Sequence, residues 1–141
     1  MQIDQDCRNV LVVDDEPIIR SVCGMVLSKN GFTPILAKNG CEGISLYKER
    51  HSEICLVLSD IAMPLMNEVE MTHQIFEVES HPNIILMTGF NESVVVPEDL
   101  RRLCSMLSKP FTPVELMVAV KKCLKYEETH HPNSRFECAI K

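Results

Sequence analysis

Acidic side chains follow two apolar runs of this chain. The run 10–13 is followed by Asp14 and Asp15, and the run 54–59 is followed by Asp60. Apolar β-branched runs are typical of buried parallel strands, and open α/β sheets form their ligand crevices at the carboxyl ends of such strands. The sequence therefore predicts that these carboxylates meet at one edge of a sheet.

Two further runs end in a hydroxyl group and in an ammonium group. The run 84–87 is followed by Thr88, and the run 106–108 is followed by Lys109 and Pro110. Carboxylates that gather without an equal number of cations repel one another, and a hard divalent cation such as Mg²⁺ relieves that repulsion. An acidic cluster of this kind, with a hydroxyl and an ammonium beside it, indicates phosphate chemistry.

Length, charge and cysteine use restrict the class of protein. The 141 residues, 45% of them hydrophobic, suffice for one domain and are too few for two. A net charge of -6 argues against direct nucleic-acid binding, which needs a basic face. No signal peptide and no membrane span of ~20 apolar residues is visible, so we expect a cytoplasmic protein without membrane attachment.

The cysteines and histidines are expected to be structurally ordinary. The 7 cysteines form no C-x-x-C pair, so we expect reduced thiols with neither disulfides nor a zinc site. Apolar runs contain four of them, for which we expect burial: Cys23, Cys55, Cys104 and Cys123. All five histidines lie on polar or turn-like segments, and exposure is expected for each: His51, His73, His81, His130 and His131.

Strands and helices are predicted to alternate along the chain. Apolar residues recur at three- and four-residue spacing over 16–30, which predicts a helix with Pro17 in its first turn. We expect the strand that contains Pro34 at a sheet edge, because proline has no amide hydrogen to donate to an inner strand ladder. The other predicted elements are strands at 10–13, 33–37, 54–59, 84–87 and 106–108 and helices at 40–50, 69–78, 97–103 and 113–126. This alternation predicts a parallel sheet with helices on both faces.

The last helix has the clearest start. Thr112 is suited to cap it, Pro113 fits its first position, and Glu115 follows the cap by three residues, which together indicate a capping box. We expect one domain at 9–126, preceded by a short arm at 1–8. The polar tail at 127–141 has no periodicity and is expected to be loose.

The chemistry-bearing residues together resemble the receiver domains of two-component response regulators. The resemblance covers 9–126 and is carried by Asp14-Asp15-Glu16, Asp60 with Met63-Pro64, Thr88-Gly89 and Lys109-Pro110-Phe111. It implies a flavodoxin-like (βα)5 fold, a doubly wound parallel sheet in the strand order 2-1-3-4-5. It also implies that Asp60 accepts a phosphoryl group from a sensor histidine kinase or a phosphotransfer protein.

Charge suggests a role for each acid. Asp60 would attack phosphorus as an ionised nucleophile, and Mg²⁺ would screen the repulsion from the phosphoryl oxygens. Asp15 is expected to ligate the metal directly and Asp14 largely through water. The family resemblance adds the backbone carbonyl of Ala62 as a further ligand.

The two other site residues would respond to the phosphoryl group. Lys109 can pair with Asp60 before phosphorylation and with a phosphoryl oxygen afterwards. The hydroxyl of Thr88 can turn inward to another oxygen, which would move its loop and change the protein surface. A receiver of this kind is not an enzyme beyond its own phosphorylation and dephosphorylation.

Several positions depart from the family pattern. Glu68 occupies a position where relatives carry glycine, which predicts an altered loop after Asp60. Met106 replaces a tyrosine or phenylalanine, so the usual aromatic switch cannot operate, although methionine can fill the same gap. Ala62 and Phe90 offer no polar side chain to orient a water, which predicts slow self-dephosphorylation.

Two alternatives remain at this point. A degenerate receiver would keep the fold as a constitutive protein-interaction module, and a metal-dependent phosphohydrolase would use a similar acid but needs a substrate pocket that the sequence does not show. Taken singly, Asp15 would more often cap a helix, and Lys109 would more often be a solvated loop charge. The sequence leaves open the downstream protein target, a phosphorylation-dependent dimer, and whether the domain stands alone or belongs to a longer regulator or hybrid kinase.

Overall fold

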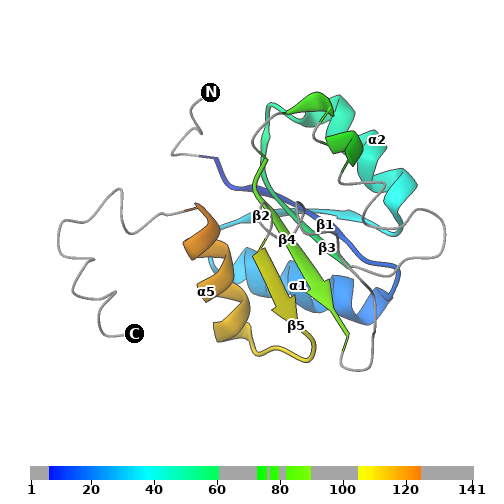
Figure 1. Cartoon of the computed structure of the whole chain (residues 1–141). Coiled ribbons are helices and arrows are strands. Elements are labelled where there is room, and N and C mark those ends of the chain that lie inside the picture. Colours follow the sequence, from blue (N-terminus) through cyan, green and yellow to red (C-terminus); the bar gives the residue numbers. More distant parts are fainter. Residues whose placement is uncertain (1–6, 61–72, 76, 80–81, 90–104, 125–141) are drawn as a thin grey trace, which may run out of the picture.

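The protein is built around one parallel sheet. Its computed structural model describes residues 7–60, 73–75, 77–79, 82–89 and 105–124. The sheet has 5 strands in the order β2-β1-β3-β4-β5, which confirms the predicted flavodoxin-like topology (Figure 1). The strands are β1 (Asn9–Val13), β2 (Thr33–Ala37), β3 (Ile54–Asp60), β4 (Ile84–Thr88) and β5 (Ser105–Ser108). The helices that the described residues contain in full are α1 (Pro17–Lys29), α2 (Gly40–Arg50) and α5 (Pro113–Leu124).

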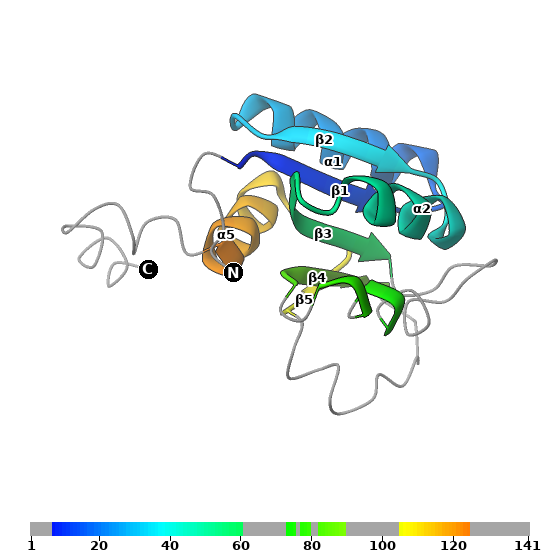
Figure 2. The same ribbon diagram turned by 90° about the horizontal axis from the view of Figure 1, so that it is seen from above.

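Helices cover both faces of this sheet. Helices α1 and α5 lie on one face and α2 lies on the other, as Figures 1 and 2 show from two directions. The first face packs Val10, Val12, Leu56 and Leu58 against Cys23 and Leu27 of α1 and Leu116 and Val120 of α5. The second face packs Leu11, Val13 and Val57 against Ile44 and Tyr47 of α2 and against Ile75. Strand β3 is buried along its whole length because both of its faces are covered.

Strand register aligns the carboxyl ends of the central strands. Val13 at the end of β1 pairs with Ser59, so Asp14 leaves β1 beside Asp60, the last residue of β3. Asp60 in turn pairs with Met87, which precedes Thr88. The parallel sheet thus brings acids that are far apart in the chain to one edge.

A register shift interrupts the pairing of β1 and β3 near their amino ends. Asn9 pairs with Ile54, whereas Val10 pairs with Leu56, so β3 carries one extra residue, Cys55, at this point. Such a bulge redirects side chains locally. The core contacts agree, because Ile54 and Leu56 face opposite sides of the sheet although they are two residues apart.

Local sequence signals set the helix ends. Helix α1 starts at Pro17 and ends before Gly31, whose φ of 88° is readily adopted only by glycine. The amide of Phe32 donates to the carbonyl of Leu27, and that of Gly31 to Ser28, which is a Schellman motif. The end that Asn30-Gly31 predicted for this helix is therefore confirmed.

The start of α5 is also as predicted. The amide of Glu115 donates to Thr112 Oγ1 at 3.1 Å, and the amide of Thr112 donates to Glu115 Oε1 at 2.9 Å. These reciprocal bonds form the capping box read from the sequence. Helix α2 begins similarly, with the amide of Glu42 donating to Asn39 Oδ1 at 2.8 Å.

Other predictions from the sequence have mixed outcomes. Strand β2, which contains Pro34, lies at a sheet edge as expected. Cys23 and Cys55 are buried as expected, whereas Cys123 is half-buried. His73 is exposed, but the expectation of exposure is wrong for His51, which is half-buried near the Tyr47 ring.

Some predicted segments are only partly described. Of the helix expected at 69–78, residues 73–75 and 77–78 are helical. The helix expected at 97–103, the tail at 127–141, Cys104, His81, His130 and His131 lie outside the described residues. Within the part of the chain that the structure describes, no helix is long and apolar enough to cross a membrane.

Candidate functional site

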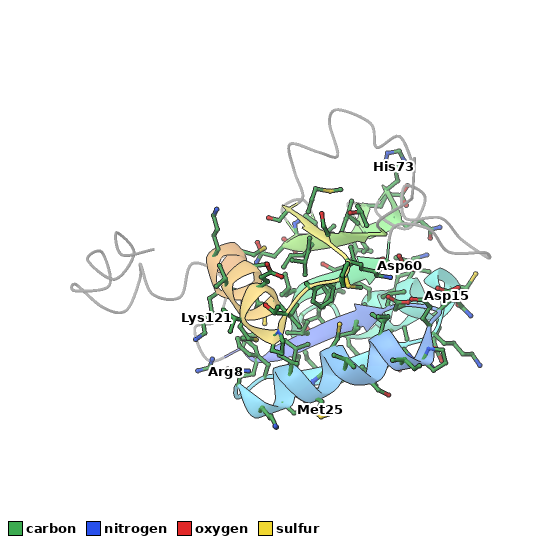
Figure 3. The ribbon with its side chains drawn as sticks, turned by 90° about the horizontal axis from the view of Figure 1, so that it is seen from below. Arg8, Asp15, Met25, Asp60, His73 and Lys121 are labelled. Atoms are coloured by element: carbon green, nitrogen blue, oxygen red, sulfur yellow. The ribbon has the colours of Figure 1, made fainter. Side chains whose placement is uncertain are left out.

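Three carboxylates meet at the carboxyl edge of the sheet. Asp14 follows β1 and is fully buried, Asp60 ends β3 and is 3% exposed, and Asp15 is exposed. One carboxylate oxygen from each lies within 4.8 Å of the others. Figure 3 shows Asp15 and Asp60 on the same side of the sheet. The carboxylates are therefore close enough to share one cation.

Asp14 is held in place by the backbone around it. Its amide donates to the carbonyl of Ala37 at 3.1 Å, which extends the ladder between β1 and β2 beyond the last strand residue. Its Oδ1 accepts a hydrogen bond from the amide of Glu16 at 2.9 Å. This local turn orients the carboxylate at the point where the chain leaves the sheet for α1.

Lys109 supplies positive charge to this acidic edge. Its Nζ lies 3.2 Å from Asp14 Oδ2 and 3.3 Å from Asp60 Oδ1, and 3.6 Å from Glu16 Oε1. The lysine side chain is only 14% exposed. Because the contacts with Asp14 and Asp60 are largely removed from water, they are screened less than a surface ion pair.

Burial and charge shift the pKa values of this pair. Burial raises the pKa of Asp14 above its usual value of 3.8, and the hydrogen bond from Glu16 and the charge of Lys109 offset this only in part. Burial alone would lower the pKa of Lys109, but the charges of Asp14 and Asp60 outweigh it, so the pKa is raised. Lys109 is therefore charged at neutral pH, whereas the ionised form of Asp14 carries a residual cost.

Thr88 lies beside this cluster and is tied to it through the backbone. It is the last residue of β4 and is half-buried, one position beyond the partner of Asp60. The amide of Lys109 donates to the carbonyl oxygen of Thr88 at 2.7 Å. The hydroxyl-bearing and the ammonium-bearing strand ends are thus directly linked.

The sequence reasoning missed Arg20. Its Nη1 donates to the backbone carbonyl oxygen of Asp14 at 2.7 Å, and its amide donates to the carbonyl of Glu16. A cation in the first turn of α1, six residues after Asp14, was the available signal. The spacing alone does not say that the side chain folds back over the turn.

Some expected contributors are not placed at the site. Ala62, Met63-Pro64, Glu68 and Phe90 lie outside the described residues. Met106 is described, and it is 43% exposed on β5. Its side chain therefore faces the surface here.

The donor set fits a hard divalent cation. Carboxylate oxygens are the ligands that Mg²⁺ and Ca²⁺ prefer. Among the described residues, Lys109 brings one positive charge to the carboxylates of Asp14 and Asp60, and three carboxylates converge here, so negative charge remains in excess. A divalent ion would neutralise that excess.

Comparison with known proteins agrees with the fold. Residues 10–121 match the response regulator receiver domain family, and the chain belongs to this family of two-component signalling proteins. It is 31% identical over 123 residues to the regulatory protein AtoC of Escherichia coli, an alignment that covers 85% of this chain. It is 28% identical over 119 residues to the chemotaxis protein CheY of Bacillus subtilis, an alignment that covers 83% of this chain.

The two relatives differ in how much of their length is matched. The chain spans 26% of AtoC but 98% of CheY. The crystal structure of a response regulator receiver domain protein from Clostridium thermocellum superposes with a TM-score of 0.77 at 23% identity. That match covers 86% of this chain and 97% of the other, and it shows the shared fold.

Proposed function

We propose that Asp60 accepts a phosphoryl group from the phosphohistidine of a sensor histidine kinase or of a phosphotransfer protein. The observation that carries this proposal is the contact of Lys109 Nζ with both Asp14 and Asp60 at a buried strand edge. A nucleophilic carboxylate next to a fixed ammonium group suits attack on an anionic phosphoryl group, because the ammonium offsets the repulsion.

In the transfer itself, an oxygen of Asp60 forms a bond to phosphorus. The bond between phosphorus and the donor nitrogen breaks, and the histidine keeps the electron pair of that bond. Lys109, whose Nζ lies 3.3 Å from Asp60 Oδ1, would then pair with a phosphoryl oxygen instead of the free carboxylate. The lysine thus stays paired before and after the reaction.

Asp14, Asp15 and Asp60 would hold Mg²⁺, and the family resemblance adds the backbone carbonyl of Ala62. When bound, Mg²⁺ supplies charge that screens the phosphoryl oxygens from Asp60. The support for this assignment is the convergence of the carboxylate oxygens within 4.8 Å. Asp14 would hold its place in the cluster, because it is fully buried and its carboxylate accepts a hydrogen bond from the backbone amide of Glu16.

Thr88 would convert the chemical change into a change of shape. Its hydroxyl can donate to a phosphoryl oxygen on Asp60, the residue that ends the neighbouring strand. Because the backbone of Thr88 is bonded to that of Lys109 at 2.7 Å, both strand ends would respond together. The output would be an altered surface for a protein partner.

The proposal is tested with the purified chain, Mg²⁺ and a small phosphodonor such as acetyl phosphate. We expect one phosphoryl adduct by mass spectrometry, lost in Asp60→Asn and retained in Asp15→Asn only at higher Mg²⁺ concentration. Glu49→Gln is the matched control, since it removes a carboxylate charge from an exposed position of α2.

The alternatives give different results in the same experiment. A constitutive interaction module would form no adduct at all, and a phosphohydrolase would release phosphate over many turnovers. An adduct that persists in Asp60→Asn would place the acceptor elsewhere and refute the assignment.

A further inference from the structure

A pair of thiols lies at the end of the sheet opposite the acids. Cys7 precedes β1 by two residues, and Cys55 is the second residue of β3. Figure 3 shows Arg8, the neighbour of Cys7, far from Asp15. The proposed phosphoacceptor chemistry makes no use of these thiols.

Each thiol donates a hydrogen bond to the segment that carries the other thiol. Cys7 Sγ donates to the carbonyl of Glu53 at 3.2 Å, and Cys55 Sγ donates to the carbonyl of Asn9 at 3.3 Å. Glu53 stands two residues before Cys55, and Asn9 stands two residues after Cys7. Both hydrogen bonds therefore join residues 7–9 to residues 53–55.

Two further features hold this stretch together. Asn9 Nδ2 donates to the carbonyl of Glu53 at 2.9 Å, the same oxygen that accepts from Cys7. Cys55 is the extra residue at the register shift, because Asn9 pairs with Ile54 and Val10 pairs with Leu56. The bulge thus presents the Cys55 side chain to the beginning of β1.

The Cys7 side chain also forms part of the surroundings of the Cys55 thiol. Burial, and then a hydrogen bond with the Cys7 side chain, raise the pKa of Cys55. Cys55 is 7% exposed and stays protonated at neutral pH, whereas Cys7 is half-buried and nearer to solvent. A small oxidant would therefore react at Cys7 first, and Cys55 would be the resolving thiol.

We propose that Cys7 and Cys55 form an oxidation-sensitive pair that closes to a disulfide when the protein meets a peroxide. The Cys7 thiolate attacks one oxygen of hydrogen peroxide, the O–O bond breaks, and hydroxide leaves with the proton of the original thiol as water. The Cys55 sulfur then attacks the sulfenic sulfur, and the hydroxyl leaves with the Cys55 proton as a second water. Two thiols are oxidised and one peroxide is reduced.

The disulfide would join the chain before β1 to the central strand. The loop that it closes contains β1, α1, β2 and α2, and restricting a loop of this length in the unfolded chain stabilises the fold. The bond would lie away from Asp60 and Lys109. Oxidation should therefore raise thermal stability while leaving the phosphoacceptor chemistry in place.

The test uses the full chain treated with hydrogen peroxide and then mapped by non-reducing peptide mass spectrometry. We expect an intramolecular Cys7–Cys55 peptide with a loss of two hydrogens, reversed by dithiothreitol. The melting temperature should rise by on the order of 5 °C. Cys7→Ser should abolish both changes, and Cys41→Ser, which removes an exposed thiol of α2, should abolish neither.

Other outcomes would overturn the proposal. A sulfinic acid at Cys7 without a disulfide, or a disulfide that joins other cysteines, would show that the pair does not close. An unchanged mass would show that hydrogen peroxide does not oxidise Cys7. Because Cys55 is buried, Cys55→Ser could destabilise the fold, so the comparison of Cys7→Ser with the parent decides the question.

Discussion

Arg20 Nη1 donates a hydrogen bond of 2.7 Å to the backbone carbonyl oxygen of Asp14. The bond reaches back from the first turn of α1 to the residue that leaves β1. It fixes the turn that carries Asp14 and Asp15, and it does not itself occupy their carboxylate oxygens. Arg20 is thus a positioning residue for the acidic edge.

Arg20→Ala should weaken Mg²⁺ binding while the fold is retained. A hydrogen bond from a charged donor contributes about 1.5 to 3 kcal/mol, so the loss of affinity should be about tenfold or more. Isothermal titration calorimetry with Mg²⁺ measures it. Arg20→Lys should recover part of the affinity, because the ammonium can still reach a carbonyl oxygen.

Arg50→Ala is the matched control for this substitution. Arg50 pairs with Glu53 at 3.0 Å on the surface; it ends α2, and Glu53 precedes the end of β3 that is opposite Asp60. Its removal should leave Mg²⁺ affinity unchanged. Equal losses of affinity in both arginine variants would show that Arg20 acts through general charge and not through the turn.

Lys109→Met should lower the free energy of unfolding in the absence of divalent cations. Asp14 and Asp60 would lose the ammonium that lies 3.2 and 3.3 Å from them, at a cost of about 2 to 4 kcal/mol. Urea unfolding in EDTA measures this loss. Millimolar Mg²⁺ should restore part of the stability, because a bound cation replaces the missing charge; the same loss with and without Mg²⁺ would contradict this account.

The buried Asp14 makes metal-free stability depend on pH. Its pKa is raised above 3.8 by burial, so the folded state binds a proton more tightly than the unfolded state does. Stability from this group is therefore present at low pH and is lost as the pH rises from 3.8 through the raised value. Urea unfolding in EDTA across this range should show the decline in the free energy of unfolding. In Asp14→Asn the decline should be smaller, because the contribution of Asp14 is removed.

Thr112→Ala should destabilise the protein by about 1 kcal/mol without altering phosphorylation at Asp60. The hydroxyl of Thr112 accepts from the amide of Glu115 at 3.1 Å, and the substitution leaves that amide without its cap. Urea unfolding gives the change in stability. Val114→Ala, at a position that is 71% exposed, is the control and should change stability by much less.

The residues that could be predicted from the sequence are those with local signals. Asp60 follows an apolar run, and a buried parallel strand places its last residue at the ligand edge whatever the rest of the chain does. Thr112 and Glu115, which define the start of α5, lie within four residues of each other. In these cases the determinants lie close together in the sequence, so the pattern was sufficient.

The features that were missed depend on distant or flexible parts. The extra residue Cys55 exists only relative to the register of β1, which no local pattern records. Arg20 reaches the turn through a long side chain whose direction the helical spacing does not fix. The 43% exposure of Met106 on the edge strand β5 likewise depends on what covers that strand, which the local sequence does not record.

The 2.7 Å bond from the amide of Lys109 to the carbonyl of Thr88 has a consequence for mutational thermodynamics. Substitutions at these two positions perturb one shared backbone junction, so their individual free energies should not sum. A double-mutant cycle on Thr88→Ala and Lys109→Met would return a sizeable interaction energy. With such an interaction energy, neither position could be credited with a separate contribution to stability.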